Sequence, residues 1–213
     1  MRTKTLLLSA AVGAVGLLAA DAQVYSVNSV GYINVPIVPG YNMISNPLVP
    51  AGGTLNLNTV LPVAAEDEVV FTWNSQTQSY NNSIFVPGVG WAPNLALAPG
   101  EGFFYQALSP GTLTFVGEVR QTGQGLASKP IVSGYNLISS QVPQAATLDV
   151  LGVPGSEDDV IFRWNGVAQS YVVGGTFVPG VGWAGGTTVA VAEAFFLNAS
   201  VPLTWNRTFS VNN

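Results

Sequence analysis

Ile37-Val-Pro-Gly-Tyr-Asn-Met-Ile-Ser45 returns along this chain as Ile131-Val-Ser-Gly-Tyr-Asn-Leu-Ile-Ser139, 94 residues later. A second stretch, Phe85-Val-Pro-Gly-Val-Gly-Trp-Ala92, returns without a change as Phe177-Val-Pro-Gly-Val-Gly-Trp-Ala184, 92 residues later. Such internal similarity indicates that one structural unit is present twice. We therefore divide the chain into residues 1–22, discussed below, unit 1 (residues 23–118) and unit 2 (residues 119–213).

Short runs of β-branched and aromatic residues, separated by Gly, Pro and Asn, recur through both units and predict strands joined by tight turns. Only Thr54–Leu61 and Thr147–Leu151 have a weakly helical pattern, each with a threonine placed to cap the first turn. The predicted fold class is all-β. We expect two tandem, pseudo-symmetric units, each a β-sandwich or barrel-like fold with at most one or two helical turns.

Two kinds of turn are predicted within the units. Asn165-Gly166 is the dipeptide that best fits a type I′ hairpin turn, so we expect Val160–Trp164 to pair with Val167–Val172. Pro87-Gly88 and Pro179-Gly180 have the residue order of a type II turn. No linker rich in Ser, Pro or charge separates the units, which predicts two packed lobes or one continuous sandwich.

The chain begins with a basic segment, a short apolar run and small residues at Ala20 and Ala22. This layout predicts a signal peptide over residues 1–22, cleaved after Ala22, because the apolar run is too short to cross a bilayer. We expect a secreted protein, whether extracellular, periplasmic or in the cell envelope, without an integral membrane segment after cleavage. The opening strand Val24–Val27 is expected to pair with Phe209–Val211.

The amino-acid composition limits the kinds of molecule that this protein can bind. After residue 22 only four basic side chains remain against ten acidic ones, so the clustered positive charge that binds nucleic acid is missing. The chain has no cysteine, so its stability must come from its core without disulfides. A surface rich in uncharged polar residues suits polysaccharide or further copies of the same protein.

The absence of histidine and cysteine also limits the reactions that the chain could catalyse and the metals that it could bind. It removes Ser-His-Asp catalysis, thiol nucleophiles and structural zinc sites. Glu101 and Glu193 are the candidate carboxyl pair for a glycosidase, but they occupy equivalent repeat positions and a catalytic pair needs two different environments. We expect both to accept hydrogen bonds from turn amides. No catalytic residue and no cofactor is predicted.

Two acidic triplets, Glu66-Asp-Glu68 and Glu157-Asp-Asp159, also occupy equivalent positions. Three adjacent acids cannot all reach one calcium ion, and the residue spacing of known calcium loops is missing. We interpret the triplets as solvated loops and predict no metal site.

Aromatic residues give the strongest indication of a binding surface, because the C–H faces of sugars pack on flat rings while Asn and Gln bond the hydroxyls. For Trp73 and Trp164, alternation with Phe71 and Phe162 favours the core over a ligand site. For Trp91 and Trp183, which follow the Pro-Gly turns, both locations stay open. The candidate ligand-binding residues are Trp91, Trp183, Tyr80, Tyr171, Asn74 and Asn165.

The string Gly-Tyr-Asn-(Met or Leu)-Ile-Ser and the segment Pro99-Gly-Glu-Gly-Phe-Phe104 resemble a repeated module of secreted bacterial proteins. The chain is especially similar to uncharacterised exported proteins of Verrucomicrobia-type bacteria, whose mature ends begin much like Gln23-Val-Tyr-Ser-Val-Asn-Ser-Val-Gly-Tyr32. Unit 2 departs from the module where Gly100-Glu-Gly102 becomes Ala192-Glu-Ala194. The resemblance implies an extracellular or envelope β protein and no catalytic residues.

These observations together predict a non-catalytic structural or adhesive protein of the cell envelope or extracellular matrix, which associates with itself or with a cell-surface polysaccharide. The first alternative is a carbohydrate-binding module that uses exposed tryptophans. A glycoside-acting enzyme is the second.

Overall fold

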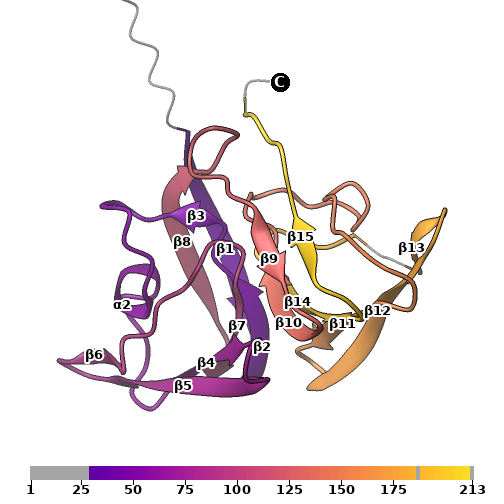
Figure 1. Cartoon of the computed structure of the whole chain (residues 1–213). Coiled ribbons are helices and arrows are strands. Elements are labelled where there is room, and N and C mark those ends of the chain that lie inside the picture. Colours follow the sequence, from indigo (N-terminus) through magenta and orange to yellow (C-terminus); the bar gives the residue numbers. More distant parts are fainter. Residues whose placement is uncertain (1–28, 186–187, 212–213) are drawn as a thin grey trace, which may run out of the picture.

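The computed structural model describes residues 29–185 and 188–211 and is built almost entirely of β-strands (Figure 1). The all-β prediction is confirmed. The expected signal peptide over residues 1–22 and the expected strand Val24–Val27 lie outside the described residues. In the described part, the segment near Phe209 lies instead beside Thr122, whose backbone N–H donates to Phe209 O at 2.9 Å.

Unit 1 contributes one short helix and eight strands. They are β1 (Val30–Ile37), β2 (Gly40–Ser45), β3 (Leu48–Val49), α2 (Leu57–Val60), β4 (Val69–Asn74), β5 (Ser79–Val86), β6 (Gly90–Ala92), β7 (Gly102–Ala107) and β8 (Gly111–Val119). The described part of unit 2 contributes strands alone. They are β9 (Lys129–Ile131), β10 (Gly134–Ser139), β11 (Val160–Asn165), β12 (Ser170–Val178), β13 (Gly182–Ala184), β14 (Ala194–Ala199) and β15 (Leu203–Trp205).

Each unit contains one five-stranded antiparallel sheet. The strand order is β2-β7-β4-β5-β6 in unit 1 and β10-β14-β11-β12-β13 in unit 2, so the two orders correspond strand by strand. This correspondence is compatible with the predicted pseudo-symmetry. Figure 1 shows unit 1, in indigo to magenta, beside unit 2, in orange to yellow.

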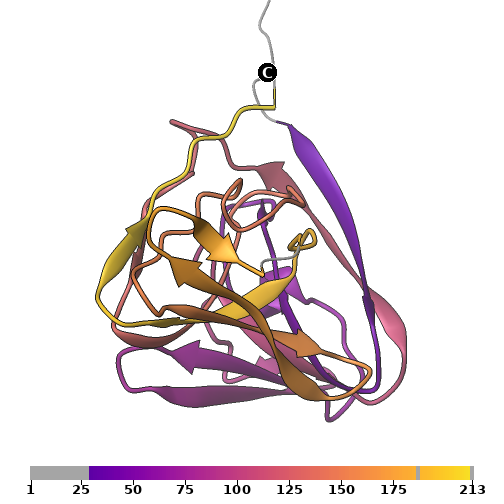
Figure 2. The same ribbon diagram turned by 90° about the vertical axis from the view of Figure 1, so that its right-hand side faces the viewer.

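The smaller sheets differ between the units. Unit 1 has the order β1-β8-β3, whereas unit 2 has only the pair β15-β9. Figure 2 shows the long ribbon of β1 and β8 along one side of the molecule and the yellow C-terminal segment along the other. The core of unit 1 lies between its two sheets and joins Phe103 from β7 to Phe115 from β8.

A β-bulge accounts for a change in the repeat spacing. Trp73 pairs with Tyr80 as Trp164 pairs with Tyr171, but in unit 2 the register shifts between Ile161 and Phe162. The extra residue of β12 is Gly174. A bulge of this kind accommodates one inserted residue without moving the rest of the strand to the opposite face.

The interior strands β7 and β14, each second in the order of its sheet, are buried on both faces. In β7, Phe103 belongs to the unit 1 core, whereas Phe104 belongs to a third cluster that joins the units. The members of this third cluster are Met43, Phe104, Leu137, Ala194 and Phe196. The other unit therefore covers the outer face of each five-stranded sheet at β7 and β14, while the outer parts of β5 and β12 remain exposed.

One predicted turn is wrong and the other is supported. Asn165 pairs with Ser170, so residues 166–169 form a loop, and β12 does not begin at Val167. The loop forms because Asn165 Oδ1 accepts hydrogen bonds from the backbone N–H groups of Val167 and Ala168, at 3.0 and 2.9 Å. The Pro-Gly turns have the positive φ of a type II turn, 79° at Gly88 and 78° at Gly180.

The helical predictions were too long. In unit 1 only Leu57–Val60 is helical, and Asn56 caps it through a hydrogen bond from Thr59 N to Asn56 Oδ1 of 3.0 Å. In unit 2 residues 148–152 form a turn, at which Thr147 Oγ1 accepts from Val150 N at 3.4 Å. In the described part of the chain, no helix is long and apolar enough to span a membrane.

Candidate functional site

Trp91 and Trp183, the predicted stacking residues, belong to the two hydrophobic cores. Their exposed fractions are 2% and 5%. Each indole N–H donates to a buried backbone carbonyl, Trp91 Nε1 to Leu61 O at 2.7 Å and Trp183 Nε1 to Val153 O at 2.9 Å. A buried indole needs such an acceptor, and here it fixes the ring inside the protein. The expectation that these two rings contact a ligand is therefore corrected.

Tyr80 and Tyr171, in contrast, lie at the surface and come together across the junction of the units. Their exposed fractions are 44% and 47%, and their hydroxyl oxygens are 3.4 Å apart. Partial burial raises the pKa of Tyr80 well above its ordinary value, and the hydrogen bond with Tyr171 raises it further. The Tyr80 phenol is therefore neutral at physiological pH.

These two tyrosines are shared by a pair of adjacent pockets with aromatic walls. The pockets have volumes of about 250 and 330 Å³. The first is lined by Tyr41, Phe71, Tyr80, Phe104, Trp164 and Tyr171. The second is lined by Trp73, Tyr80, Tyr135, Phe162, Tyr171 and Phe196. We call these ten residues the aromatic surface.

Each pocket combines rings from both units, and hydrogen bonds across the junction fix their orientation. Trp73 Nε1 donates to Tyr135 O and Trp164 Nε1 donates to Tyr41 O, both at 2.7 Å. Trp73 also meets Phe196 edge to face, with ring centroids 5.3 Å apart. The pockets are therefore pre-formed, which reduces the entropy cost of binding a ligand.

Two glutamines form hydrogen bonds across the same junction between the units. Gln169 Oε1 accepts from Tyr41 N at 2.7 Å, and Gln169 Nε2 donates to Tyr41 O at 3.1 Å. Gln78 makes the equivalent pair of bonds to Tyr135, at 2.9 and 3.0 Å. The close approach requires glycine at Gly40, where φ is +90° and a Cβ atom would lie 2.5 Å from Gln169 Oε1.

Asn74 and Asn165 build loops at the edge of this surface. Asn74 Oδ1 accepts from the backbone N–H groups of Gln76 and Thr77, at 2.9 and 3.1 Å. Both asparagines also line polar pockets that are separate from the aromatic ones. Their side-chain oxygens are thus engaged in loop structure, which the sequence reasoning did not anticipate.

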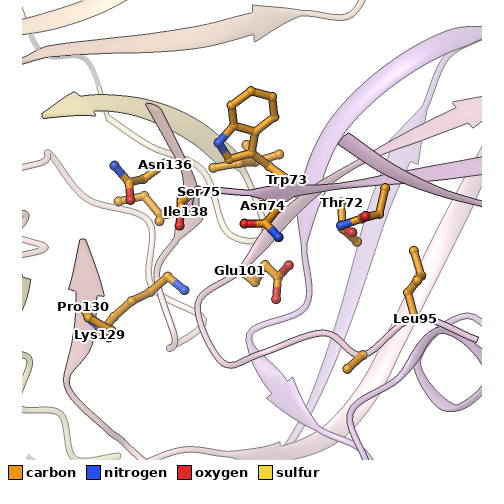
Figure 3. A pocket seen from close by; sticks show the side chains of 13 residues that line it. Thr72, Trp73, Asn74, Ser75, Leu95, Glu101, Lys129, Pro130, Asn136 and Ile138 are labelled. Carbon is orange, nitrogen blue, oxygen red and sulfur yellow. The ribbon is translucent and has the colours of Figure 1, made fainter. Parts of the chain in front are cut away.

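The polar pocket beside Asn74 has a volume of about 420 Å³. Glu101 and Lys129 both line it, and Figure 3 shows the Lys129 side chain extending toward Glu101, whose carboxylate lies on the side away from Lys129. Burial raises the pKa of Glu101, and it lowers the pKa of Lys129, although the two charges attract each other. Trp73 lines this pocket as well as the second aromatic pocket.

The predicted role of Glu101 and Glu193 at turn amides is confirmed. Ala98 N donates to Glu101 Oε2 at 2.7 Å, and Ala190 N donates to Glu193 Oε2 at 2.9 Å. The two carboxylates differ in one respect, because Glu193 also forms an ion pair with Arg163 at 2.5 Å.

The prediction that the acidic triplets are solvated loops is wrong for one acid in each triplet. The third acid of each is buried, with exposed fractions of 5% for Glu68 and 0% for Asp159. Asp159 accepts from Ser156 N at 2.8 Å and from Ser200 N at 2.7 Å, so it holds a loop to a neighbouring strand end. Over residues 29–185 and 188–211, no group of three His, Cys, Asp or Glu residues could hold a metal ion.

Eight members of the aromatic surface were not predicted as ligand-binding from the sequence: Tyr41, Phe71, Trp73, Phe104, Tyr135, Phe162, Trp164 and Phe196. A signal was present in the repeated Gly-Tyr-Asn string, because strand alternation places Tyr41 on the face opposite Asn42. Alternation alone cannot tell that this face meets a second unit.

Comparison with protein-family models, curated proteins and solved structures finds no match in any of the three. The resemblance to the exported bacterial module stays a prediction.

Proposed function

We propose that this protein is a non-catalytic adhesive protein of the cell exterior that holds neutral polysaccharide on its aromatic surface. The observation that carries the proposal is the pair of adjacent, pre-formed aromatic pockets that share Tyr80 and Tyr171. Ligand pockets in proteins are lined mainly by hydrophobic and aromatic side chains, with a few polar groups that orient the ligand.

The chemistry of the surface fits sugar rings. The C–H faces of a pyranose pack on aromatic rings, and the phenol groups of Tyr80 and Tyr171 supply hydrogen bonds to its hydroxyls. All ten residues are Tyr, Phe or Trp, and none is a Lys or Arg that would bind an anion, so a neutral chain is favoured over an anionic one.

The pairing of the pockets favours a chain over a single sugar. With volumes of about 250 and 330 Å³, each pocket suits one small ring system. Once one residue of a polysaccharide is bound, the next is held at high effective concentration near the second pocket. Two weak contacts then give useful adhesion.

Catalysis is not part of the proposal. Both candidate carboxylates accept from turn amides, and Glu193 is also held by Arg163, so each has a structural role in its loop. Self-association of the protein through sheet edges is a separate prediction, which light scattering over a concentration series would test.

The test is calorimetric titration of the protein with neutral hexasaccharides of glucose, mannose and galactose. We expect Tyr80→Ala and Tyr171→Ala each to weaken binding by about tenfold or more, because central aromatic contacts typically contribute over 1 kcal/mol. Tyr32→Ala is the matched control, since Tyr32 is 66% exposed on β1 and lies outside the aromatic surface.

Stability is measured in parallel, because loss of binding through unfolding would mislead. Both variants should keep a melting temperature close to that of the parent, since the tyrosines are nearly half exposed. The proposal fails if no hexasaccharide binds, or if Tyr80→Ala and Tyr171→Ala bind as well as the control.

A further inference from the structure

The molecule contains two polar pockets at equivalent positions, and they differ in how their charges are arranged. The Lys129 pocket, of about 420 Å³, contains Glu101 and Lys129. The Arg163 pocket, of about 450 Å³, contains Glu193 and Arg163. Each also contains the tryptophan of the aromatic surface from its own side, Trp73 or Trp164.

In the Arg163 pocket the charges satisfy each other. Arg163 Nε donates to Glu193 Oε1 at 2.5 Å, and Arg163 Nη2 donates to Glu193 Oε2 at 2.7 Å. This two-pronged geometry is the strongest form of carboxylate pairing. The pocket offers no unpaired carboxylate to a ligand.

In the Lys129 pocket the charges stay apart. Thr72 occupies the position that Arg163 has in unit 2, because Phe71-Thr72-Trp73 corresponds to Phe162-Arg163-Trp164. Arg163 and Glu193 form an ion pair, whereas within the described residues none joins Lys129 to Glu101, so their charged atoms are more than 4.0 Å apart. Nor does Lys129 Nζ have a hydrogen-bond partner in that part of the chain.

Glu101 and Lys129 have both lost much of their hydration without forming an ion pair with each other. Burial is the largest cause of the raised pKa of Glu101 and of the lowered pKa of Lys129. A buried charge without sufficient hydrogen bonds is unfavourable, so a ligand that bonds to both groups gains from satisfying them.

We propose that the Lys129 pocket binds one pyranose residue through two neighbouring hydroxyls, one donating to Glu101 and one accepting from Lys129. The sugar ring lies beside the indole of Trp73. This subsite rests on the proposed polysaccharide function and deepens it, because Trp73 also lines the second aromatic pocket. A chain on the aromatic surface reaches the Lys129 pocket at this ring.

The subsite gives the bound chain a direction. The aromatic pockets are nearly equivalent, so on their own they do not distinguish the two ends of a polysaccharide. Only one of the two polar pockets has separated charges, and the chain therefore binds with one orientation.

The experiment titrates the full protein with the same neutral hexasaccharides. Lys129→Met keeps most of the side-chain length and removes the donor, and Glu101→Gln removes the charge while keeping an acceptor for Ala98 N. We expect each to weaken binding by about tenfold or more, the usual effect of losing a hydrogen bond to a charged group. Glu66→Gln, at an exposed position, is the control and should bind as the parent does.

A second measurement observes the subsite directly. The carboxyl carbon of Glu101, assigned by NMR through comparison with Glu101→Gln, should shift on addition of hexasaccharide, while that of Glu193 should not. The shift itself is measured on the parent protein, so it does not depend on how tightly the variants bind.

The outcomes separate the two proposals. If Lys129→Met and Glu101→Gln bind as the control does and the Glu101 signal stays fixed, the subsite is wrong, while loss of binding in Tyr80→Ala still supports the aromatic surface. If Lys129→Met weakens binding and the tyrosine variants do not, the aromatic surface is wrong and the subsite stands. Absence of any hexasaccharide binding by the parent protein overturns both.

Discussion

Glu101 and Glu193 occupy equivalent repeat positions, each two residues before a Phe-Phe pair, but their electrostatic surroundings differ. Glu193 receives two hydrogen bonds from Arg163, whereas Thr72 stands at the corresponding place near Glu101. One substitution between the repeats, Arg to Thr, thus leaves Glu101 without the cation that its counterpart has. Stability at different pH values should reveal this difference.

Glu101→Gln and Glu193→Gln are expected to act in opposite ways. The folded pKa of Glu101 is raised above its ordinary value of 4.5, so the folded state favours the neutral acid. The stability that the neutral acid contributes is therefore lost as pH rises through the raised pKa of the folded state. Glu101→Gln should melt at the same temperature as the parent or higher at about pH 7, and this advantage should shrink toward about pH 4.

Glu193→Gln should instead lower the free energy of unfolding by about 1–2 kcal/mol at neutral pH, since Arg163 loses its charged acceptor in a mostly buried pair. Thermal unfolding followed by circular dichroism from about pH 4 to pH 7 measures both variants. Parallel pH profiles for the two variants would contradict the assignment.

At the residue level the sequence predicts which face a side chain occupies better than what covers that face. Alternation placed Trp73 with Phe71, and both do lie on one face of β4. Trp91 follows a glycine-rich turn, where alternation gives no clear answer, and only the structure shows its indole bonded to Leu61 O. Tyr80 and Tyr171 were predicted as binding residues, but the contact between their side chains was not predicted.

At the scale of elements, the loops at residues 75–78 and 166–169 have a second task besides joining strands. Gln78 and Gln169 each have a φ of 50° and extend from these loops to the first strand of the other unit's five-stranded sheet. Their targets begin with Gly40 and Gly134, which have φ angles of +90° and +94°. The contact of Gln169 with Tyr41 therefore requires glycine at position 40, and the contact of Gln78 with Tyr135 requires glycine at position 134.

Gly40→Ala should destabilise the protein more than Gly88→Ala does. Both positions have positive φ, so each substitution has a strain cost of about 1–2 kcal/mol. A Cβ atom at Gly88 meets nothing within 4 Å, whereas at Gly40 it would lie 2.5 Å from Gln169 Oε1. The flexible Gln169 side chain must then move aside and lose its hydrogen bonds to Tyr41, so we expect an additional loss of about 1–2 kcal/mol for Gly40→Ala, measured by urea unfolding.

Gly88→Ala is the control for strain alone. Combining Gly40→Ala with Gln169→Ala should recover part of the loss, because the clash then disappears. Equal destabilisation by Gly40→Ala and Gly88→Ala would show that the glutamine does not clamp this strand.

The elements themselves were largely predictable. The repeated strands and the Pro-Gly turns follow from local residue preferences, and the structure contains them. The turn after Trp164 was mispredicted because the Asn165 side chain bonds Val167 N and Ala168 N, a local competition that the Asn-Gly rule ignores. The bulge near Gly174 also could not be placed from hydrophobic alternation.

For the whole molecule, the junction between the units is built like a core. Ser45 Oγ donates to Ser139 Oγ at 2.6 Å, and Ser139 Oγ donates to Glu193 O at 2.8 Å. Main-chain bonds cross as well, from Ser45 N to Ala192 O at 2.9 Å and from Ser139 N to Gly100 O at 3.0 Å. Both serines are 1% exposed.

We expect the two units to unfold together. Separation would leave these serines and the aromatic cluster around Phe104 and Phe196 exposed, which is unfavourable for either unit alone. Urea unfolding followed by circular dichroism and by tryptophan fluorescence should give one coincident transition. Two separate transitions would show that the units are independent domains.

The arrangement of the units was beyond sequence reasoning for a physical reason. Repeats show which residues are equivalent, but contacts such as Gln78 with Tyr135 join non-equivalent residues of the two copies. The sequence of one unit does not indicate which residues of the other unit it contacts. The aromatic surface, which depends on those contacts, could be predicted only in part.

Each aromatic pocket takes rings from both units, and this has a mechanical consequence. If an adhesive protein is pulled along its bound chain, tension acts on the seam between the units. The proposed grip lasts only while the seam stays closed, and opening the seam also exposes the buried serines and the cluster of Phe104 and Phe196. Because neither unit is expected to stay folded alone, a load that opens the seam would unfold the protein as it releases the chain, and the attachment would hold firmly up to that load.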